Sequence, residues 1–537
     1  MPRQFFYMAF LAFLMNACHG SRPAAGDPCA EPVKTEAGLI RGLAESGTQT
    51  CAWHGVPYAA PPTGEQRFRA PGPVKPWAGV RDGKVWGHRC TQKNTLALRF
   101  FNSDPSGDLS EDCLYLNVWR PQKPGKYPVM VWIPGGGYGI GTGNTPSYWG
   151  DRLSETGQVV VVTINYRLGY FASLTLPKLR DEDPNHSAGS YGALDQVAAL
   201  KWVNRNVENF GGDPGNVTVF GESAGGWSVC SLLASPLAKG LFHRAIMESG
   251  GCGQSATLEA GFEEGKVVAK SLGCGPDDLI CLRQVPAEKI VEVAPTPTFT
   301  RFSFGPHQDG YFLSDQPLTL IRSGNSNRVP YIGGTNRDEM KANVTGKNKE
   351  LRDLPPAQYQ EKLAALLPIP RASAQELAKL YPLGDYDNKP INAYAQMVTD
   401  FAFACPTFEG LQASAQFMAN TYQFRFDWDE MRGGQKNGAM HGMDVPFVFN
   451  SFDRRMFNMF YSKSLRQKAA PLARSLQSYW INFAKTGDPN GPGLPLWPKL
   501  DPGDPYLLVF DNVITAQPAG LSARCKFWKE HETHLSW

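Results

Sequence analysis

The stretch NVTVFGESAGGW (residues 216–227) decides the fold. Its first five residues form a β-branched apolar run typical of a strand, and residues 227–234 have the composition of a helix. Between them lies Gly-x-Ser-x-Gly, and the order strand, tight turn, helix predicts a nucleophile elbow at Ser223. Gly221 and Gly225 fit this turn because its strained backbone admits only small residues two positions either side of the serine.

Strand and helix patterns alternate outward from the elbow. Residues 129–133 and 159–164 are continuous apolar runs, typical of strands buried on both faces of a sheet. Residues 193–210 have helical spacing that ends at Gly211 and Gly212. Later strands are predicted at 244–249, 329–332 and 421–426. The pattern predicts an α/β fold with a large, mostly parallel central sheet.

The composition excludes several classes of protein. The chain has 537 residues, of which 42% are apolar and 19% charged, and the net charge of +3 is spread without a basic block, which argues against nucleic-acid binding. No apolar run is long enough to span a membrane. We expect one large domain over residues 31–537, in which segments 255–325 and 345–415 are mainly helical insertions that cap the sheet and shape a gorge over the elbow.

The N-terminus predicts export. Arg3 precedes an apolar stretch at residues 5–15 that has the length of a signal-peptide core, so residues 1–20 are interpreted as a signal. Cys18 follows a small residue, which resembles a bacterial lipoprotein cleavage site, while simple secretion after Gly20 is the alternative. The expected location is therefore secreted or periplasmic, or membrane-anchored through lipid on Cys18.

Export makes the eleven cysteines candidates for disulfides. Four candidate pairs close loops of increasing length, although spacing alone does not fix their connectivity. These candidates are Cys274 with Cys281, Cys29 with Cys51, Cys90 with Cys113, and Cys405 with Cys525. Cys230 and Cys252 are left over, and we expect them to be free buried thiols.

A serine nucleophile needs a base, an acid that orients the base, and donors for the oxyanion. Glycines at 135–137 follow the strand that ends at Ile133, and with the N–H of Ala224 they predict an oxyanion hole; the alternative phosphate-binding pattern is not completed there. His441 lies in a loop after the 421–426 strand, whereas His531 and His534 fall in the last seven residues. Asp338 and Glu339 both remain candidates for the acid.

Together these motifs resemble the type-B carboxylesterases, the cholinesterase-like branch of the α/β-hydrolases. The resemblance runs from about residue 31 to the end of the chain. Besides the elbow, the matching blocks are EDCLYLN (111–117), NYR (165–167), NRDE (336–339), MHG (440–442) and NFAKTGDP (482–489). Pro134 departs from the family pattern, since many relatives have His or Tyr before the glycines.

The resemblance implies a role for each matching residue. It makes Ser223 the nucleophile and His441 the base, and it selects Glu339 over Asp338 as the acid. The oxyanion donors it implies are Gly136, Gly137 and Ala224, with Glu222 and Ser249 beside the triad. It also implies the disulfides Cys90–Cys113, Cys274–Cys281 and Cys405–Cys525 and the ion pairs Arg67–Glu111 and Arg167–Asp195.

The predicted activity is hydrolysis of neutral carboxylic esters through an acyl-enzyme, on small-molecule substrates and without cofactor or metal. The cholinesterases of the family that the chain resembles hold the quaternary ammonium of choline over a tryptophan in the loop closed by the disulfide that matches Cys90–Cys113. In this chain, residues 91–112 contain Phe100 and Phe101 but no tryptophan. A phenyl face holds a quaternary ammonium less well than indole does, which favours neutral esters over choline esters. The alternative is a catalytically silent adhesion or binding homologue, which normally loses the serine or the histidine. The natural ester is not encoded in any recognisable motif.

Overall fold

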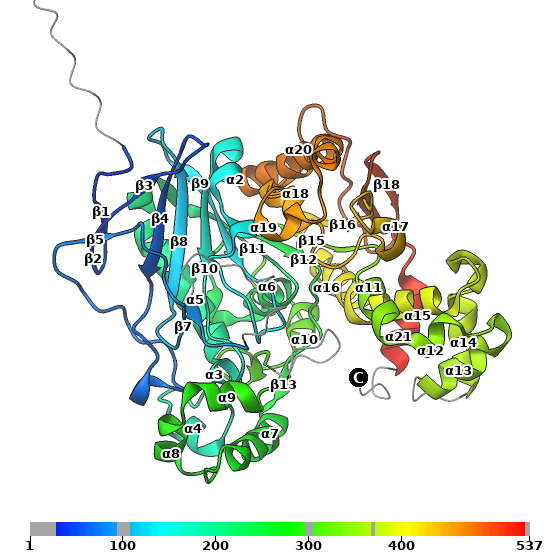
Figure 1. Cartoon of the computed structure of the whole chain (residues 1–537), viewed down its shortest axis with the longest axis horizontal. Helices are drawn as coiled ribbons and strands as arrows, with labels where there is room; N and C mark the ends of the chain where they lie inside the picture. The colour runs from blue at the N-terminus through cyan, green and yellow to red at the C-terminus, as the bar shows by residue number, and fades with distance from the viewer. Residues whose placement is uncertain (1–27, 94–107, 296–303, 367–370, 532–537) are drawn as a thin grey trace, which may run out of the picture.

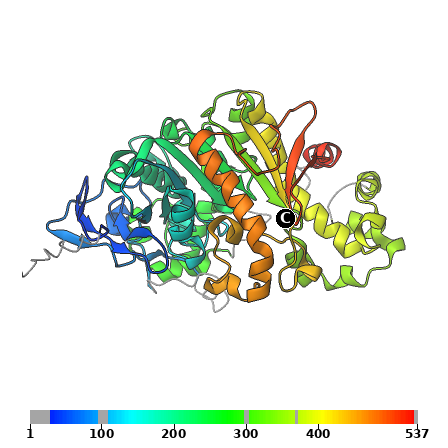
Figure 2. The ribbon, with the colours of Figure 1, turned by 90° about the horizontal axis from the view of Figure 1, so that it is seen from above.

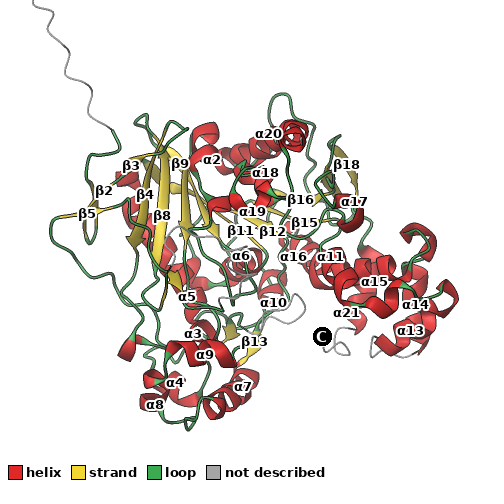
Figure 3. Cartoon of the chain, in the orientation of Figure 1, coloured by secondary structure: helices red, strands yellow, loops and turns green. Residues whose placement is uncertain are grey.

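The computed structural model describes residues 28–93, 108–295, 304–366 and 371–531. The predicted signal with Cys18, residues 94–107 with both of their phenylalanines, and His534 lie outside these ranges. Within them the fold is the predicted α/β-hydrolase architecture, in which an eleven-stranded sheet lies between layers of helices (Figures 1 and 3).

The sheet has the strand order β18-β17-β16-β15-β12-β11-β9-β10-β8-β4-β3. All neighbours from β10 across to β17 are parallel, while the strands at the two edges pair antiparallel. In chain order the strands are β3 (Leu43–Ala44), β4 (Thr50–Pro57), β8 (Tyr115–Pro121), β9 (Tyr127–Ile133), β10 (Val160–Ile164), β11 (Gly212–Glu222), β12 (Arg244–Glu248), β15 (Tyr331–Asn336), β16 (Thr421–Phe426), β17 (Tyr506–Phe510) and β18 (Thr515–Pro518).

The central strands are apolar on both faces because helices cover both. Successive side chains of a strand point to opposite faces, and Val131 and Val219 pack into one core cluster whereas Trp132 and Phe220 pack into the other. The first cluster lies under α3 (Tyr170–Ser173), α5 (Tyr191–Asn206), α6 (Ala224–Ala234), α10 (Pro317–Arg322) and α16 (Cys405–Ala415). The second lies under α2 (Asp151–Gly157), α18 (Val445–Phe449), α19 (Arg455–Asn458) and α20 (Lys463–Thr486), the long orange helix across the strands in Figure 2.

The two predicted insertions are helical, as expected. The first holds α7 (Leu258–Ser271), α8 (Leu279–Gln284) and α9 (Ala287–Val293), which lie next to α4 (Pro177–Glu182) at one end of the sheet (Figure 1). In the second, α16 packs on β15 and β16, and the remaining helices form a lobe beside the sheet whose core also includes Leu507 and Val509 of β17. The lobe contains α11 (Lys341–Lys347), α12 (Lys349–Arg352), α13 (Tyr359–Leu366), α14 (Arg371–Leu380), α15 (Pro390–Thr399) and the C-terminal α21 (Ser522–His531).

Short elements complete the chain. A three-stranded sheet and two two-stranded sheets lie apart from the main sheet. Their strands are β1 (Val33–Thr35), β2 (Gly38–Arg41), β5 (Val80–Asp82), β6 (Arg89–Cys90), β7 (Leu109–Ser110), β13 (Ala256–Thr257) and β14 (His307–Gln308). Short helical turns are η1 (Gly64–Gln66), η2 (Pro146–Tyr148), η3 (Val207–Phe210), η4 (Pro236–Ala238), η5 (Pro356–Gln358), η6 (Leu383–Tyr386), η7 (Asp400–Ala404) and α17 (Gly434–Asn437).

Five disulfides are formed. Four join the candidate pairs Cys29–Cys51, Cys90–Cys113, Cys274–Cys281 and Cys405–Cys525, of which the last ties α21 to α16. The fifth joins Cys230 to Cys252, so the expectation of two free thiols is wrong. The reason is tertiary: α6 packs on β11 and β12, which brings Cys230 on α6 against the loop that follows β12.

Two ion pairs lie where the resemblance implies them. Arg167 forms a bidentate pair with Asp195 on α5, at 2.8 and 2.7 Å, and Arg67 bonds Glu111. In the described ranges no helix is both long and apolar enough to cross a membrane, and no cluster of acidic, histidine and cysteine side chains has the arrangement of a metal site.

Candidate active site

Ser223 stands between β11 and α6 in a left-handed backbone conformation, with φ 58° and ψ −124°. Such a φ is strained for a residue with a side chain, and two hydrogen bonds hold it: the Ser223 N–H donates to Glu248 O at 2.9 Å, and the Trp227 N–H donates to Ser223 O at 2.9 Å. A Cβ on Gly225 would lie 2.0 Å from Ile133 O. The turn therefore requires glycine there, as the sequence predicts.

His441 is held by the acid that the resemblance selects. Its Nδ1 lies 2.6 Å from Glu339 Oε2, while the other oxygen of Glu339 accepts the Asn336 N–H at 2.7 Å. The Asn336 side chain donates to Met440 O at 2.9 Å, which ties the end of β15 to the histidine loop. These bonds orient the imidazole through one buried carboxylate.

Asp338, the other candidate acid, points elsewhere. Its carboxylate accepts from Arg337 Nε at 2.7 Å and from the Ala439 N–H at 3.1 Å, and it lies 3.5 Å from Lys341 Nζ. The structure thus brings Glu339 to His441 and turns Asp338 toward cations and the loop backbone. His531, the remaining described late histidine, ends α21 and bonds Ser373, within the lobe.

The second nitrogen of His441 faces the elbow. Nε2 lies 3.1 Å from Glu222 Oε1, and Glu222 is the residue immediately before Ser223. The Phe403 ring packs against the imidazole with a centroid distance of 4.7 Å. A Cβ on Gly135 would lie 3.0 Å from both Ser223 Cβ and Glu222 Oε2, so the glycine loop closes over the same two side chains.

The glycine loop has the backbone that an oxyanion hole needs. Gly136 and Gly137 have φ of 116° and 59°, and Tyr166 fixes the loop by donating its hydroxyl hydrogen to Pro134 O at 2.9 Å. In the described part of the chain, neither the Gly136 nor the Gly137 N–H donates a hydrogen bond. Ala224 is the first residue of α6, where N–H groups have no acceptor within the helix.

Three buried carboxylates, Glu222, Glu339 and Asp444, act electrostatically on the imidazole, and a fourth buried carboxylate, Glu248, interacts with Glu222 and Asp444. Burial disfavours their ionised form. It raises the pKa of Glu222 to about 8, against the attraction of His441, and it raises that of Asp444 to about 6, with the help of Glu339. Burial and Asp444 together raise the pKa of Glu248 well above its usual value.

The nearby acids also raise the pKa of His441, which favours its charged form, whereas the raised pKa values of the acids favour their neutral forms. Burial by itself disfavours the imidazolium, but the Glu222 and Glu339 carboxylates outweigh it and raise the pKa of His441 to about 9. Glu248 and Asp444 were missed by sequence reasoning. Their positions in the sequence could have indicated that they lie near the site. Glu248 directly precedes Ser249 at the end of a buried strand, and Asp444 follows His441 by three residues.

A hollow of about 900 Å³ adjoins the elbow on the side of the first insertion. Tyr138, Tyr170 and Trp227 form its aromatic wall, and Glu263 and Glu264 of α7 its acidic wall. Tyr138 directly follows the glycine loop and Trp227 lies one turn into α6 after Ser223, so two of the lining residues are close to the nucleophile along the chain. The size of the hollow is that of sites for small organic molecules.

Comparisons with known proteins agree with this geometry. The model of the carboxylesterase family matches residues 30–528. The chain is 36% identical to para-nitrobenzyl esterase of Bacillus subtilis, over 90% of this chain and 96% of the relative, and 32% identical to cholinesterase of Mus musculus, over 93% and 86%. A solved structure of a PNB esterase superposes with a TM-score of 0.79 at 34% identity and covers 93% of this chain and 99% of the other.

Proposed function

The chain belongs to the carboxylesterase family and is a serine carboxylic-ester hydrolase, and we propose that Ser223, His441 and Glu339 are its nucleophile, base and orienting acid. One observation carries the assignment: Glu339 holds Nδ1 of His441 at 2.6 Å while Nε2 faces the residue next to the strained serine. All three residues are present, which weighs against a catalytically silent homologue.

The proposed reaction is two-step acyl transfer. His441 takes the proton of the Ser223 hydroxyl as its oxygen attacks the ester carbonyl, and the resulting oxyanion accepts hydrogen bonds from the N–H groups of Gly136, Gly137 and Ala224. His441 then protonates the leaving alcohol. A water that gives its proton to His441 attacks the acyl-enzyme, and His441 passes that proton to the Ser223 oxygen as the acid leaves, which restores both residues. Glu339 stabilises the imidazolium in both steps.

The proposed substrates are neutral esters. Glu263 and Glu264 line the hollow that Tyr138 and Trp227 also line, and they disfavour an acyl chain that carries a carboxylate there. Glu263 is paired with Lys266 at 2.7 Å, and Glu264 accepts the Tyr170 hydroxyl hydrogen at 3.0 Å, so both acids also have protein partners. The proposal that choline esters are poorer substrates than neutral esters rests on the absence of tryptophan from residues 91–112.

The disulfides indicate an oxidising compartment. Beyond that, we propose that residues 1–20 direct export, that residues 31–537 form the single esterase domain, and that Cys18 carries a lipid anchor. The sequence support is the short apolar stretch before Cys18 and the polar tether after it.

The proposed nucleophile is tested by Ser223→Ala. We expect turnover of p-nitrophenyl esters to fall about 10⁶-fold, as for removal of a triad serine, and covalent labelling by an organophosphate to vanish, with the thermal unfolding transition unchanged. Retention of a tenth of the activity would refute the assignment. A panel of p-nitrophenyl esters of increasing acyl length on the parent protein then defines the acyl range.

A further inference from the structure

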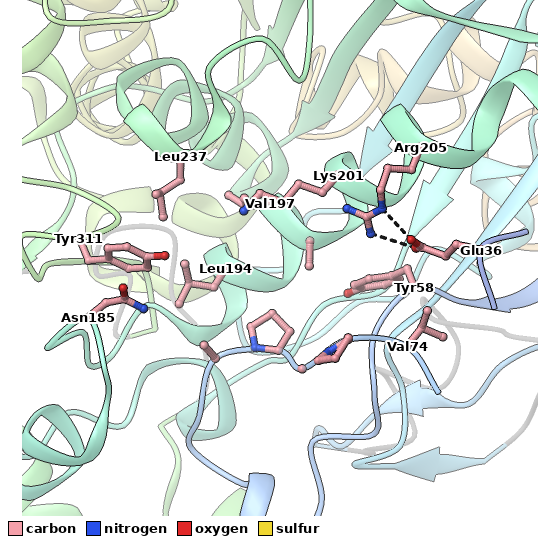
Figure 4. A pocket seen from close by; sticks show the side chains of 15 residues that line it. Glu36, Tyr58, Val74, Asn185, Leu194, Val197, Lys201, Arg205, Leu237 and Tyr311 are labelled. Atoms are coloured by element: carbon pink, nitrogen blue, oxygen red, sulfur yellow. Dashed lines mark hydrogen bonds and ion pairs between the residues drawn. The ribbon is translucent and has the colours of Figure 1, made fainter. Parts of the chain in front are cut away.

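A second hollow, of about 350 Å³, lies away from the proposed active site. It is a trough between α5 and the loop of residues 70–74 (Figure 4). Leu237 and Tyr311 stand at one end and Glu36 and Arg205 at the other. None of the proposed triad or oxyanion residues lines it, so the catalytic chemistry leaves this hollow unexplained.

The floor of the trough is one stripe of α5 that changes from apolar to basic. Leu194, Val197, Ala198, Lys201 and Arg205 line the hollow at spacings of three, four, seven and eleven residues, which places them on one face of the helix. The stripe is about 16 Å long at 1.5 Å per residue. A surface stripe of this kind suits a ligand that is apolar along most of its length and carries charge near one end.

The charges of the lining select an anion. Glu36 is neutralised by Arg205, whose Nε and Nη2 donate to its two oxygens at 2.7 and 2.9 Å, and this bonding lowers the pKa of Glu36. Lys201 is the remaining charged lining residue, and in the described part of the chain it forms no ion pair. The described lining therefore has a net charge of one positive unit.

The other wall is apolar and rigid. Pro71 and Pro73 fix the loop below α5, and the Tyr58 hydroxyl beside them donates its hydrogen to Asn165 O at 2.6 Å, so this tyrosine contributes ring surface rather than a free donor. At roughly 30 Å³ for each water-sized group, the volume of the hollow corresponds to about a dozen non-hydrogen atoms.

From this size, floor and charge we propose that the α5 trough is a non-catalytic binding site for an unbranched monocarboxylate of about ten carbons, whose chain lies over Leu194, Val197 and Ala198 and whose carboxylate pairs with Lys201. This ligand belongs to the chemical class of the acids that ester hydrolysis releases, but the site does not depend on the proposed catalytic roles.

The test is calorimetric titration with decanoate, below its micelle concentration, of protein whose active serine has been blocked by an organophosphate. Mass spectrometry confirms the block, so a failed block reports on the proposed nucleophile and not on the trough. We expect one site per chain, with decanol and decyltrimethylammonium each binding at least tenfold more weakly than decanoate. No binding of decanoate at millimolar concentration, or equal binding of the cation, overturns the proposal.

Variants locate the site. Ala198→Trp fills the trough and should abolish decanoate binding, and Lys201→Glu should weaken it at least tenfold. Lys485→Glu, which reverses an exposed lysine in the last turn of α20 on the opposite face of the sheet, is the matched control and should change the affinity less than twofold. Esterase activity of all three should equal that of the parent. Undiminished binding by Ala198→Trp, or equal losses in both lysine variants, overturns the assignment.

Discussion

Replacing Glu339 by glutamine tests the part of the proposed triad that sequence reasoning left open. The substitution keeps the size of the side chain but removes the charge that lies 2.6 Å from Nδ1 of His441. The imidazolium that forms in each step then loses its closest counter-charge, and the amide group can also present N–H to Nδ1 and favour the wrong tautomer. We expect kcat to fall while the protein stays folded.

The distance sets the size of the effect. At an effective dielectric constant of about 20, two unit charges 2.6 Å apart attract by roughly 6 kcal/mol, or between four and five powers of ten in rate at about 1.36 kcal/mol each. The amide dipole recovers part of this attraction when its oxygen faces Nδ1. The expected fall in kcat is therefore about 10³–10⁴-fold, measured with p-nitrophenyl butyrate at saturating substrate.

Asp338→Asn is the matched control, because it neutralises the neighbouring carboxylate. Asp338 bonds Arg337 and the backbone of Ala439 but does not contact His441, so we expect kcat within about tenfold of the parent. A larger loss from Asp338→Asn than from Glu339→Gln would show that the hydrogen bond to His441 does not orient the base, and the proposed triad would be wrong.

Three further predictions follow from the site and the N-terminus. Glu222→Gln removes a carboxylate 3.1 Å from Nε2 of His441 and should therefore lower the pKa of this histidine. Because the base acts in its neutral form, we expect the acid limb of the pH profile of kcat/KM to move to lower pH. An acid limb that stays in place or moves to higher pH would contradict the assigned contact. Butyrylthiocholine should have a lower kcat/KM than a neutral thiobutyrate ester with a leaving group of similar pKa, and the reverse order would overturn the proposed preference. In a bacterial host the parent should partition with membranes and Cys18→Ser should release it or block its processing, whereas a mature N-terminus at an unmodified Ser21 would rule out the anchor.

Local patterns in the sequence were enough to predict the elbow and the sheet. The turn at Ser223 needs glycine at fixed offsets, and strands covered on both faces need unbroken apolar runs, so both requirements appear directly in consecutive residues. The choice between Asp338 and Glu339 is different, since both follow the same strand. It depends on which carboxylate the end of β15 turns inward. The bond from the Asn336 N–H to Glu339 is local, but the bonds of Asn336 to Met440 and of Glu339 to His441 join segments about a hundred residues apart.

The disulfide between Cys230 and Cys252 could not be predicted for a related reason. Its spacing of 22 residues equals that of Cys29 and Cys51, so loop length does not distinguish a pair from two thiols. What decides it is the packing of α6 on β12, which sets the two sulfurs at bonding distance inside the core. A pattern of residues predicts that the two elements exist, but not which side chains meet where they cross.

The charge state of the site is likewise a property of the fold and not of the motif. Glu222, Glu339 and Asp444 are buried near one imidazole, and Glu248 is buried near Glu222 and Asp444. Four carboxylates so placed cannot all be ionised with a single cation among them in a poorly solvated site. Glu339 has the two hydrogen bonds that stabilise a carboxylate, from the Asn336 N–H and from His441. Glu248 has a different environment, since it is fully buried, accepts the Trp480 indole N–H at 2.8 Å and has a pKa raised well above its usual value. Burial and the neighbouring Asp444 therefore disfavour the ionised form of Glu248, as burial does for Glu222, and the proposed mechanism uses the carboxylate of Glu339, which contacts His441 directly.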